Sequence, residues 1–487
     1  MANPAPRAAT GIEGLDDILG GGLSPHRLYL IEGMPGSGKT TLAFQFLMEG
    51  ARRGEPVLYV ALSETEEEIR AVASSHGWSL AGITIRQLTP SEDDLDPGEQ
   101  YTVFHPSEVE LSETTKKIFV DVERIRPARV VLDSLSELRL LAGNPLRYRR
   151  QILALKQYFS GRGCTVLMLD DLTATDHDLQ VQSIAHGALM LEHAIPGFGE
   201  PRRRLSVSKY RGSQFRGGYH DYAIRPGGLE VFPRLVAAEH RRKTSRERLG
   251  SGVPEIDQLL GGGLARGTST VIQGAAGTGK STIAALFAAA ACARGEHATL
   301  FLFDESTDTL FSRMAGLKVD LQEHLDADRL TVRPIDPAEF SPGEFAHHVR
   351  RSVEAKRSSI VVIDSLNGYL NSMPDEKFLA VQLHELLTFL GHHGAASIVV
   401  AAHHGMISAQ MSGPVDISYL ADTVMLLRYF ESEGEIRQSL SVVKMRGGEH
   451  ERTLRELKMQ GGRILVGEPL RDFSGILTGV PQKIPRR

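Results

Sequence analysis

The sequence predicts an α/β fold made of two tandem domains, each with a mostly parallel β-sheet flanked by helices. Three observations lead to this prediction. A phosphate-binding loop motif occurs twice, the two copies belong to a much longer internal repeat, and short apolar runs alternate with helical patterns in both halves. At 487 residues the chain also exceeds one ordinary domain.

The internal repeat extends far beyond the two loops. Residues Thr10–Leu23, which lead into the first loop, have a near copy in Ser251–Leu264. Later landmarks recur in the same order and at similar spacing, pairing Val130–Ser134 with Val361–Ser365 and Lys209–Gly212 with Lys444–Gly447. A repeat of this length indicates a duplicated domain, because solenoid units span only about 20–50 residues.

The duplication also predicts where the domains meet. We expect one domain at residues 1–240 and the second at residues 241–487. The run Ala237–Arg248 is polar, strongly basic and without apolar periodicity, which is typical of an exposed linker. A nucleic-acid contact is the alternative for this run, and we favour the linker.

Apolar runs in each half predict the strands. Because these runs are continuous rather than alternating, both faces of each strand should be covered, as in a parallel sheet between helices. Ligand sites in such sheets lie beyond the carboxyl ends of the strands. Strands are expected at Leu28–Glu32, Val57–Leu62, Val130–Leu132 and Val166–Leu169, and at Thr270–Gln273, Thr299–Phe303, Ile360–Ile363 and Ile398–Ala401.

The two glycine-rich loops, Gly33–Thr40 and Gly274–Ser281, each follow an apolar run and begin a helical pattern. This is the context of a P-loop, whose backbone N–H groups surround the β-phosphate of a nucleotide while its lysine reaches the β- and γ-phosphates. Lys39 and Lys280 would therefore also serve catalysis. The expected nucleotide-binding residues are Gly33, Gly36, Ser37, Gly38, Lys39, Thr40 and Thr41, and Gly274, Gly277, Thr278, Gly279, Lys280, Ser281 and Thr282.

Asp133 and Asp364 each end an apolar strand well downstream of a loop. A carboxylate there would hold Mg²⁺ through its water shell, together with the loop hydroxyl of Thr40 or Ser281. The alternative is that each aspartate caps the helix that follows. Given the loops, we favour the Mg²⁺ site.

Acidic residues follow the next strand in each half. They are Glu64 in the first half and Asp304 and Glu305 in the second. A carboxylate at this point can orient and deprotonate the group that attacks the γ-phosphate. Capping of the next helix is the alternative, and we favour catalysis.

Two cations separated by one residue recur late in each half, at Lys209 and Arg211 and at Lys444 and Arg446. On a strand such a pair points to one face. They could supply positive charge to the γ-phosphate of a neighbouring subunit. A solvated strand edge is the alternative, and the recurrence favours the functional role.

Composition excludes several classes of protein. The formal net charge of −5 gives no basic footprint for nucleic acid or an anionic membrane. No run of about 18 apolar residues occurs, and the N-terminus has no apolar signal core. Cys164 and Cys292 fall in different repeats, which argues against a disulfide. The histidine pairs at 347–348, 392–393 and 403–404 lack metal-site spacing. We expect a cytoplasmic protein.

Taken together and in this order, the repeated motifs resemble the KaiC family of circadian-clock ATPases and autokinases, over nearly the whole chain. The resemblance implies RecA-like P-loop NTPase domains, stacked as two rings of a homohexamer with ATP and Mg²⁺ bound between subunits. It implies that the cation pairs reach the neighbour's nucleotide. It also implies slow ATP hydrolysis in the first domain and autophosphorylation in the second.

The family's Ser-Thr acceptor pair corresponds here to Ser418 and Tyr419, so the resemblance carries the phosphosite to Ser418 only. Asp304, in place of the usual glutamate, would be the base for that hydroxyl, with Glu305 beside it. In the first domain Ser63 replaces one member of the acidic pair and leaves Glu64 to activate water.

The C-terminal run Leu470–Val480 resembles the segment that switches the family toward its kinase state. Only Pro481–Arg487 follow, so the longer tail that recruits KaiA is missing or reduced, and we expect no KaiA partner. A KaiB-like partner is compatible with the resemblance.

Two other functions remain alternatives. One is a RecA- or helicase-type DNA-dependent ATPase, which the acidic charge, the aromatic content of 6% and the acidic run at residues 170–178 argue against. The other is a nucleotide-gated signalling scaffold with vestigial kinase activity.

Overall fold

The structure, a computed structural model, describes residues 6–88, 106–172, 179–195, 199–240, 247–371, 378–402, 420–477 and 481–483. The chain divides into two compact units, Met1–Arg234 and Leu235–Arg487. Among the described residues, no helix is long and apolar enough to cross a membrane.

The first unit contains a nine-stranded sheet in the order β3-β2-β4-β5-β1-β6-β7-β8-β9. Pairing is parallel from β3 to β6 and antiparallel from β6 to β9. Its strands are β1 (Leu28–Gly33), β2 (Val57–Ala61), β3 (Ile83–Gln87), β4 (Arg129–Asp133), β5 (Thr165–Asp171), β6 (Gly187–Ala194), β7 (Arg202–Tyr210), β8 (Tyr219–Arg225) and β9 (Gly228–Phe232).

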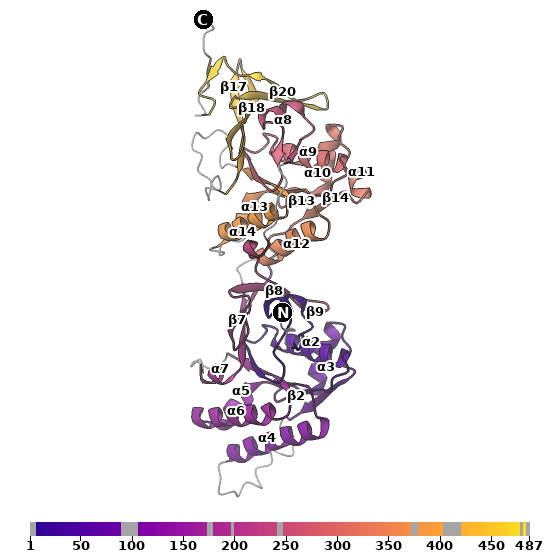
Figure 1. Ribbon diagram of the computed structural model, residues 1–487, viewed down its shortest axis with the longest axis vertical. Helices are drawn as coiled ribbons and strands as arrows, with labels where there is room; N and C mark the ends of the chain where they lie inside the picture. The colour runs from indigo at the N-terminus through magenta and orange to yellow at the C-terminus, as the bar shows by residue number, and fades with distance from the viewer. Residues whose placement is uncertain are drawn as a thin grey trace. The chain divides into compact units, whose positions relative to one another are not determined.

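Helices flank this sheet (Figure 1). They are α1 (Glu13–Ile18), α2 (Lys39–Arg52), α3 (Glu66–Ser75), α4 (Pro106–Ile125), α5 (Leu135–Ala142), α6 (Pro145–Ser160) and α7 (Leu179–Ile184). Local sequence sets several helix starts: Thr65 and Glu68 form a capping box before α3, and Asn144 caps α6, which has proline in its first turn.

The second unit repeats the plan, with the sheet order β14-β13-β15-β16-β12-β17-β18-β19-β20. Its strands are β12 (Ser269–Gly274), β13 (Ala298–Leu302), β14 (Leu330–Pro334), β15 (Ile360–Asp364), β16 (Ala396–Ala402), β17 (Thr423–Ser432), β18 (Glu435–Met445), β19 (Arg455–Gln460) and β20 (Arg463–Pro469). Two small sheets pair β10 (Arg248–Leu249) with β11 (Leu264–Ala265) and β21 (Phe473–Ser474) with β22 (Gln482–Lys483).

The helices of the second unit also flank its sheet (Figure 1). They are α8 (Pro254–Leu259), α9 (Lys280–Ala293), α10 (Thr307–Gly316), α11 (Leu321–Asp326), α12 (Pro342–Glu354), α13 (Leu366–Asn371) and α14 (Leu379–His392). The predicted fold class, two tandem α/β units with mostly parallel sheets, is confirmed.

The apolar runs are continuous because each strand serves two cores. In β1, Tyr29 and Ile31 join the core on the α2 side, while Leu28 and Leu30 join the core built with α5 and α6. Alternate residues of a strand point to opposite faces, so a strand covered on both sides must be apolar throughout. All eight expected strands fall on β1, β2, β4 and β5 or on their counterparts in the second unit.

The junction between the units differs in part from the expected linker. Residues Ala237–His240 form a short 3-10 helix, η3, and Ala237 is buried. The backbone N–H of Ala237 donates to Glu385 of α14 at 2.9 Å, and the His240 ring packs on Phe389. The expectation of a solvent-exposed linker is therefore wrong for this stretch, because it packs against the second unit.

Candidate nucleotide sites

The two phosphate loops join β1 to α2 and β12 to α9, as their sequences require. Gly36 and Gly38 have φ of 80° and 91°, and Gly277 and Gly279 have φ of 78° and 95°, a region that favours glycine. A Cβ on Gly33 would lie 2.5 Å from the Leu191 carbonyl oxygen. The glycines are thus fixed by backbone conformation and by close contact with the neighbouring strand.

Four hydroxyl residues of the loops and of the helix turns that follow them are buried. Ser37 and Thr278 are fully buried, and Thr278 donates to the carbonyl of Ala275 at 2.8 Å. Thr41 and Thr282, in the first turns of α2 and α9, are also buried. Tyrosines of two other strands, β8 and β17, contact the loops: Tyr222 donates to the Ser37 carbonyl at 2.6 Å, and Tyr429 to the Ala276 carbonyl at 3.2 Å.

The two P-loop lysines have different partners. Lys39 donates to the Gly33 carbonyl at 2.8 Å and forms an ion pair of 2.7 Å with Asp171. Lys280 donates to the Ala275 carbonyl at 2.7 Å, and burial lowers its pKa. Both ammonium groups therefore donate to carbonyls of their own loops. The phosphates of a bound nucleotide would compete for these ammonium groups.

The candidate metal ligands meet in both units. Thr40 donates to Asp133 Oδ2 at 2.9 Å, and Ser281 forms the corresponding hydrogen bond to Asp364. Burial raises the pKa of both aspartates, so a cation would offset the cost of keeping them ionised. A buried carboxylate beside a P-loop hydroxyl fits Mg²⁺.

The capping alternatives for the first unit's acids do not match the geometry. Ser134, not Asp133, occupies the N-cap position of α5. Thr65 caps α3 with its own side chain and with Glu68, which leaves Glu64 outside the cap.

Glu64 lies among other carboxylates. Burial, followed by the negative charges of Asp133, Glu68 and Asp171, raises the pKa of Glu64 to about 7. Its Oε2 atom is buried and has no hydrogen-bond partner in the described part of the chain. A carboxylate with a pKa near neutrality, and with an oxygen available, has the properties of a general base.

The acidic pair of the second unit is engaged differently. Glu305 forms a two-bond ion pair with Arg313 of α10, in which Nη2 lies 2.9 Å from Oε2. Glu305 also acts electrostatically on Asp364. Asp304 accepts a hydrogen bond from the Ser365 hydroxyl. Ser306, rather than either acid, caps α10.

The paired cations lie toward one end of the strands, and the phosphate loop of the same unit lies toward the other end. Lys209 pairs with Ala188 near the start of β6, whereas Gly33, at the loop, pairs with Leu191 further along β6. Lys209 donates to the Gln182 carbonyl at 2.5 Å. These cations are therefore not placed to contact phosphates bound in the same unit.

The other three cations of the two pairs also have partners outside the phosphate loops. Arg211 donates to the Ser183 carbonyl at 2.8 Å. In the second unit, Lys444 donates to the Ala421 carbonyl at 2.8 Å, and Arg446 lies 3.9 Å from Asp422.

Ser418, the expected phosphosite, lies outside the described residues.

Sequence reasoning missed three contributors to these sites. The sequence places Asp171 only in an acidic run, although it lies two residues after the expected strand Val166–Leu169. Tyr59 donates to Asp133 at 2.7 Å from inside β2. Arg313, the partner of Glu305, lies eight residues further along the chain, within α10, and belongs to none of the repeated motifs.

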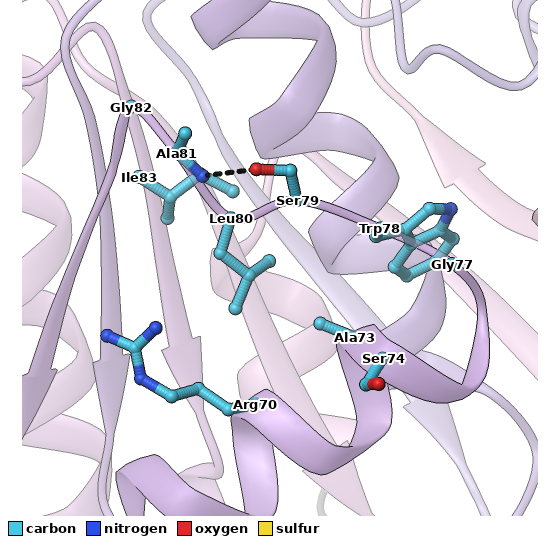
Figure 2. A pocket seen from close by; sticks show the side chains of 10 residues that line it. All are labelled: Arg70, Ala73, Ser74, Gly77, Trp78, Ser79, Leu80, Ala81, Gly82 and Ile83. Atoms are coloured by element: carbon cyan, nitrogen blue, oxygen red, sulfur yellow. Dashed lines mark hydrogen bonds between the residues drawn. The ribbon is translucent and has the colours of Figure 1, made fainter.

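A cavity of about 750 Å³ lies elsewhere in the first unit, between the end of α3 and the segment that leads into β3. Figure 2 shows Arg70 and Trp78 among the residues that line it. None of the predicted site residues lines this cavity.

Comparison with known proteins agrees with this geometry. The family described as the KaiC ATPase matches residues 8–236 and 249–471. The circadian clock oscillator protein KaiC of Parathermosynechococcus lividus is 28% identical over 98% of this chain and 88% of the relative. The circadian clock protein KaiC3 of a Synechocystis strain is 27% identical over 97% of this chain and 94% of the relative. The chain therefore belongs to the KaiC family of ATPases.

Proposed function

We propose that the first unit hydrolyses ATP and that the second unit transfers the γ-phosphoryl group of ATP to Ser418. The observation that carries this proposal is the difference between the two acidic sites. Glu64 has a pKa of about 7 and a buried oxygen that has no hydrogen-bond partner among the described residues. Glu305 is held by Arg313 and lies beside Asp304. The two phosphate loops are thus similar, whereas the carboxylates that we propose as bases have different surroundings in the two units.

In the first unit Glu64 would accept a proton from water as the water oxygen attacks the γ-phosphorus. The bond from the γ-phosphorus to the β,γ-bridging oxygen breaks, and ADP and phosphate result. Lys39 would leave Asp171 to contact the β- and γ-phosphates. Thr40 and Asp133 would hold Mg²⁺, which supplies charge neutralisation when bound.

In the second unit Glu305 and Asp304 are the candidates for accepting the Ser418 proton. The serine oxygen then forms the bond to phosphorus, and ADP leaves. Lys280, Ser281 and Asp364 take the roles of their first-unit counterparts. Because Glu305 is held in a two-bond ion pair by Arg313, we assign the base role to Asp304 and a supporting role to Glu305 beside it.

We further propose a homohexamer, in which each cation pair serves the nucleotide of a neighbouring subunit. The position of Lys209, Arg211, Lys444 and Arg446 away from their own loops supports this arrangement. The names of the relatives support a clock or signalling timer, and membership of the KaiC family is compatible with a KaiB-like partner. Two unpaired, buried cysteines are compatible with the reducing cytoplasm.

Incubation with γ-labelled ATP followed by peptide mapping tests the kinase proposal. We expect label on Ser418, and loss of that label in Ser418→Ala and in Lys280→Ala. Label that persists in Ser418→Ala would show that the acceptor lies elsewhere. An unlabelled protein that still hydrolyses ATP would leave the first-unit proposal standing and reject the second.

A further inference from the structure

We propose that His240, Glu354 and His393 bind a divalent transition-metal ion, best matched by Zn²⁺. One potential ligand atom from each residue lies within 4.8 Å of the other two. The residues come from three elements: His240 ends η3, Glu354 ends α12, and His393 directly follows α14. The cluster shares no residue with the nucleotide sites, so it does not depend on the function proposed above.

The His393 ring already has the form that a metal ligand requires. Its Nδ1 lies 3.1 Å from the carbonyl oxygen of Phe389. Because a carbonyl only accepts hydrogen bonds, Nδ1 carries a proton, and in the neutral ring the lone pair is then on Nε2. Nε2 is buried and has no hydrogen-bond partner in the described structure. A bound cation would satisfy it, and histidine ligands commonly donate their second N–H to a backbone carbonyl.

The second imidazole faces the same space. The ring centroids of His240 and His393 are 5.7 Å apart, and both rings pack on the buried ring of Phe389, at 4.9 and 4.2 Å. Burial, and then the positive charge of Arg350, lowers the pKa of His240. Both effects favour the neutral imidazole, which is the form that coordination requires.

Glu354 supplies the negative charge. Its Oε2 accepts a hydrogen bond from Arg350 Nε at 2.9 Å, an exposed pair on one helix that is worth little net free energy. Zn²⁺ binds imidazole and carboxylate at about 2.0–2.2 Å, so the ligand atoms of a tetrahedral site lie about 3.3 Å apart. Small side-chain rotations would bring the three atoms to that spacing and leave a fourth position for water.

The consequence concerns the junction of the two units. Ala237 is already held by α14, because its N–H donates to Glu385 and its carbonyl lies 3.0 Å from His392 Nδ1. The metal would fasten the other end of η3, at His240, to both α12 and α14. The site would thus anchor the chain on the second unit at the point where it leaves the first.

Titration of the full-length protein with Co²⁺, with Mg²⁺ and ATP present, tests the site. Co²⁺ in a tetrahedral site with imidazole ligands gives an intense visible absorption band, unlike Co²⁺ in octahedral oxygen sites. We expect one such site per chain, emptied of Co²⁺ by Zn²⁺. His393→Gln should weaken Co²⁺ binding by at least about 100-fold, since even outer-shell changes cost about 10–100-fold. His384→Gln, an exposed position on the same helix, should leave binding unchanged.

A second variant keeps all three ligands. Arg350→Gln should tighten Co²⁺ binding several-fold, because the guanidinium beside Glu354 repels a cation. Thermal unfolding in EDTA, expected within a few degrees of wild type for each variant, separates ligand loss from misfolding. If His393→Gln does not fold, the Co²⁺ affinities of His240→Gln and Arg350→Gln test the site instead. Absence of the band from wild type, or an unchanged affinity in the ligand variants, would overturn the proposal.

Discussion

Lys39 of the first phosphate loop is paired with Asp171, whose Oδ1 lies 2.7 Å from Nζ. Asp171 ends β5 in register with Gly33, and the same position of the second unit holds Ala402, in register with Gly274. A carboxylate therefore competes with phosphate for the lysine in the first unit, and the second unit has none at this position.

Removal of that carboxylate should strengthen nucleotide binding. We expect Asp171→Asn to tighten ATP binding in the first unit about fivefold, because breaking a partly buried ion pair costs about 1 kcal/mol. The measurement is displacement of a fluorescent ATP analogue in a Lys280→Ala background, where only the first site binds. The reciprocal variant Ala402→Asp, in a Lys39→Ala background, should weaken the second site. Unchanged affinities in both would contradict this interpretation of the pair.

The first unit should show a pH profile set by Glu64. A general base acts only when it is ionised, so kcat/KM for ATP should rise with pH and reach half its maximum near pH 7. The profile is measured as phosphate release in the Lys280→Ala background. Glu64→Gln should abolish the rise and most of the activity. A profile that is flat between pH 6 and 8 in the unmodified first unit would exclude Glu64 as the base.

Glu32 should make the stability of the first unit depend on pH. Burial raises the pKa of Glu32 to about 7, against a hydrogen bond from Gln182 that lowers it. The folded state then holds a proton that the unfolded state releases above its pKa of about 4.5, so stability falls as pH rises from about 4.5 to 7.

Glu32→Gln should remove this dependence and stabilise the unit at pH 8 by roughly 2–4 kcal/mol. Denaturant unfolding at pH 4 and pH 8 measures the free energy of unfolding. Glu67→Gln, at an exposed position of α3, is the matched control and should behave as wild type. A Glu32→Gln variant no more stable than wild type at pH 8 would refute the raised pKa.

The assignment of Arg211 to a neighbouring subunit predicts complementation. In the Lys280→Ala background, Arg211→Ala and Lys39→Ala proteins should each be nearly inactive as ATPases. Mixed oligomers should regain activity, because an intact loop can then meet an intact Arg211 from another subunit. Phosphate release after mixing and reassembly measures this gain. Mixtures no more active than the sum of their parts would place Arg211 outside the reaction.

The sequence was sufficient for the repeat, the parallel strands and the phosphate loops, because each rests on local spacing. The positive φ at Gly38 and the continuous apolar run of β1 are each marked by residue types within a few positions of one another. The fold class followed from these local features alone.

Contacts between distant segments were beyond the sequence. Asp171 meets Lys39 only because β5 lies beside β1. The spacing of His393 in the sequence does not predict a metal site, yet the fold places it close to His240, which is far away in the sequence. In both cases chemistry depends on strand order or helix packing, which spacing does not encode.

Division of labour between the units is the central claim, and one paired measurement tests it most directly. Phosphate release and label on Ser418 are recorded together for Glu64→Gln and Ser418→Ala. We expect Glu64→Gln to lose most phosphate release and retain the label, and Ser418→Ala to lose the label and retain most phosphate release. Loss of both activities in either variant would contradict the account.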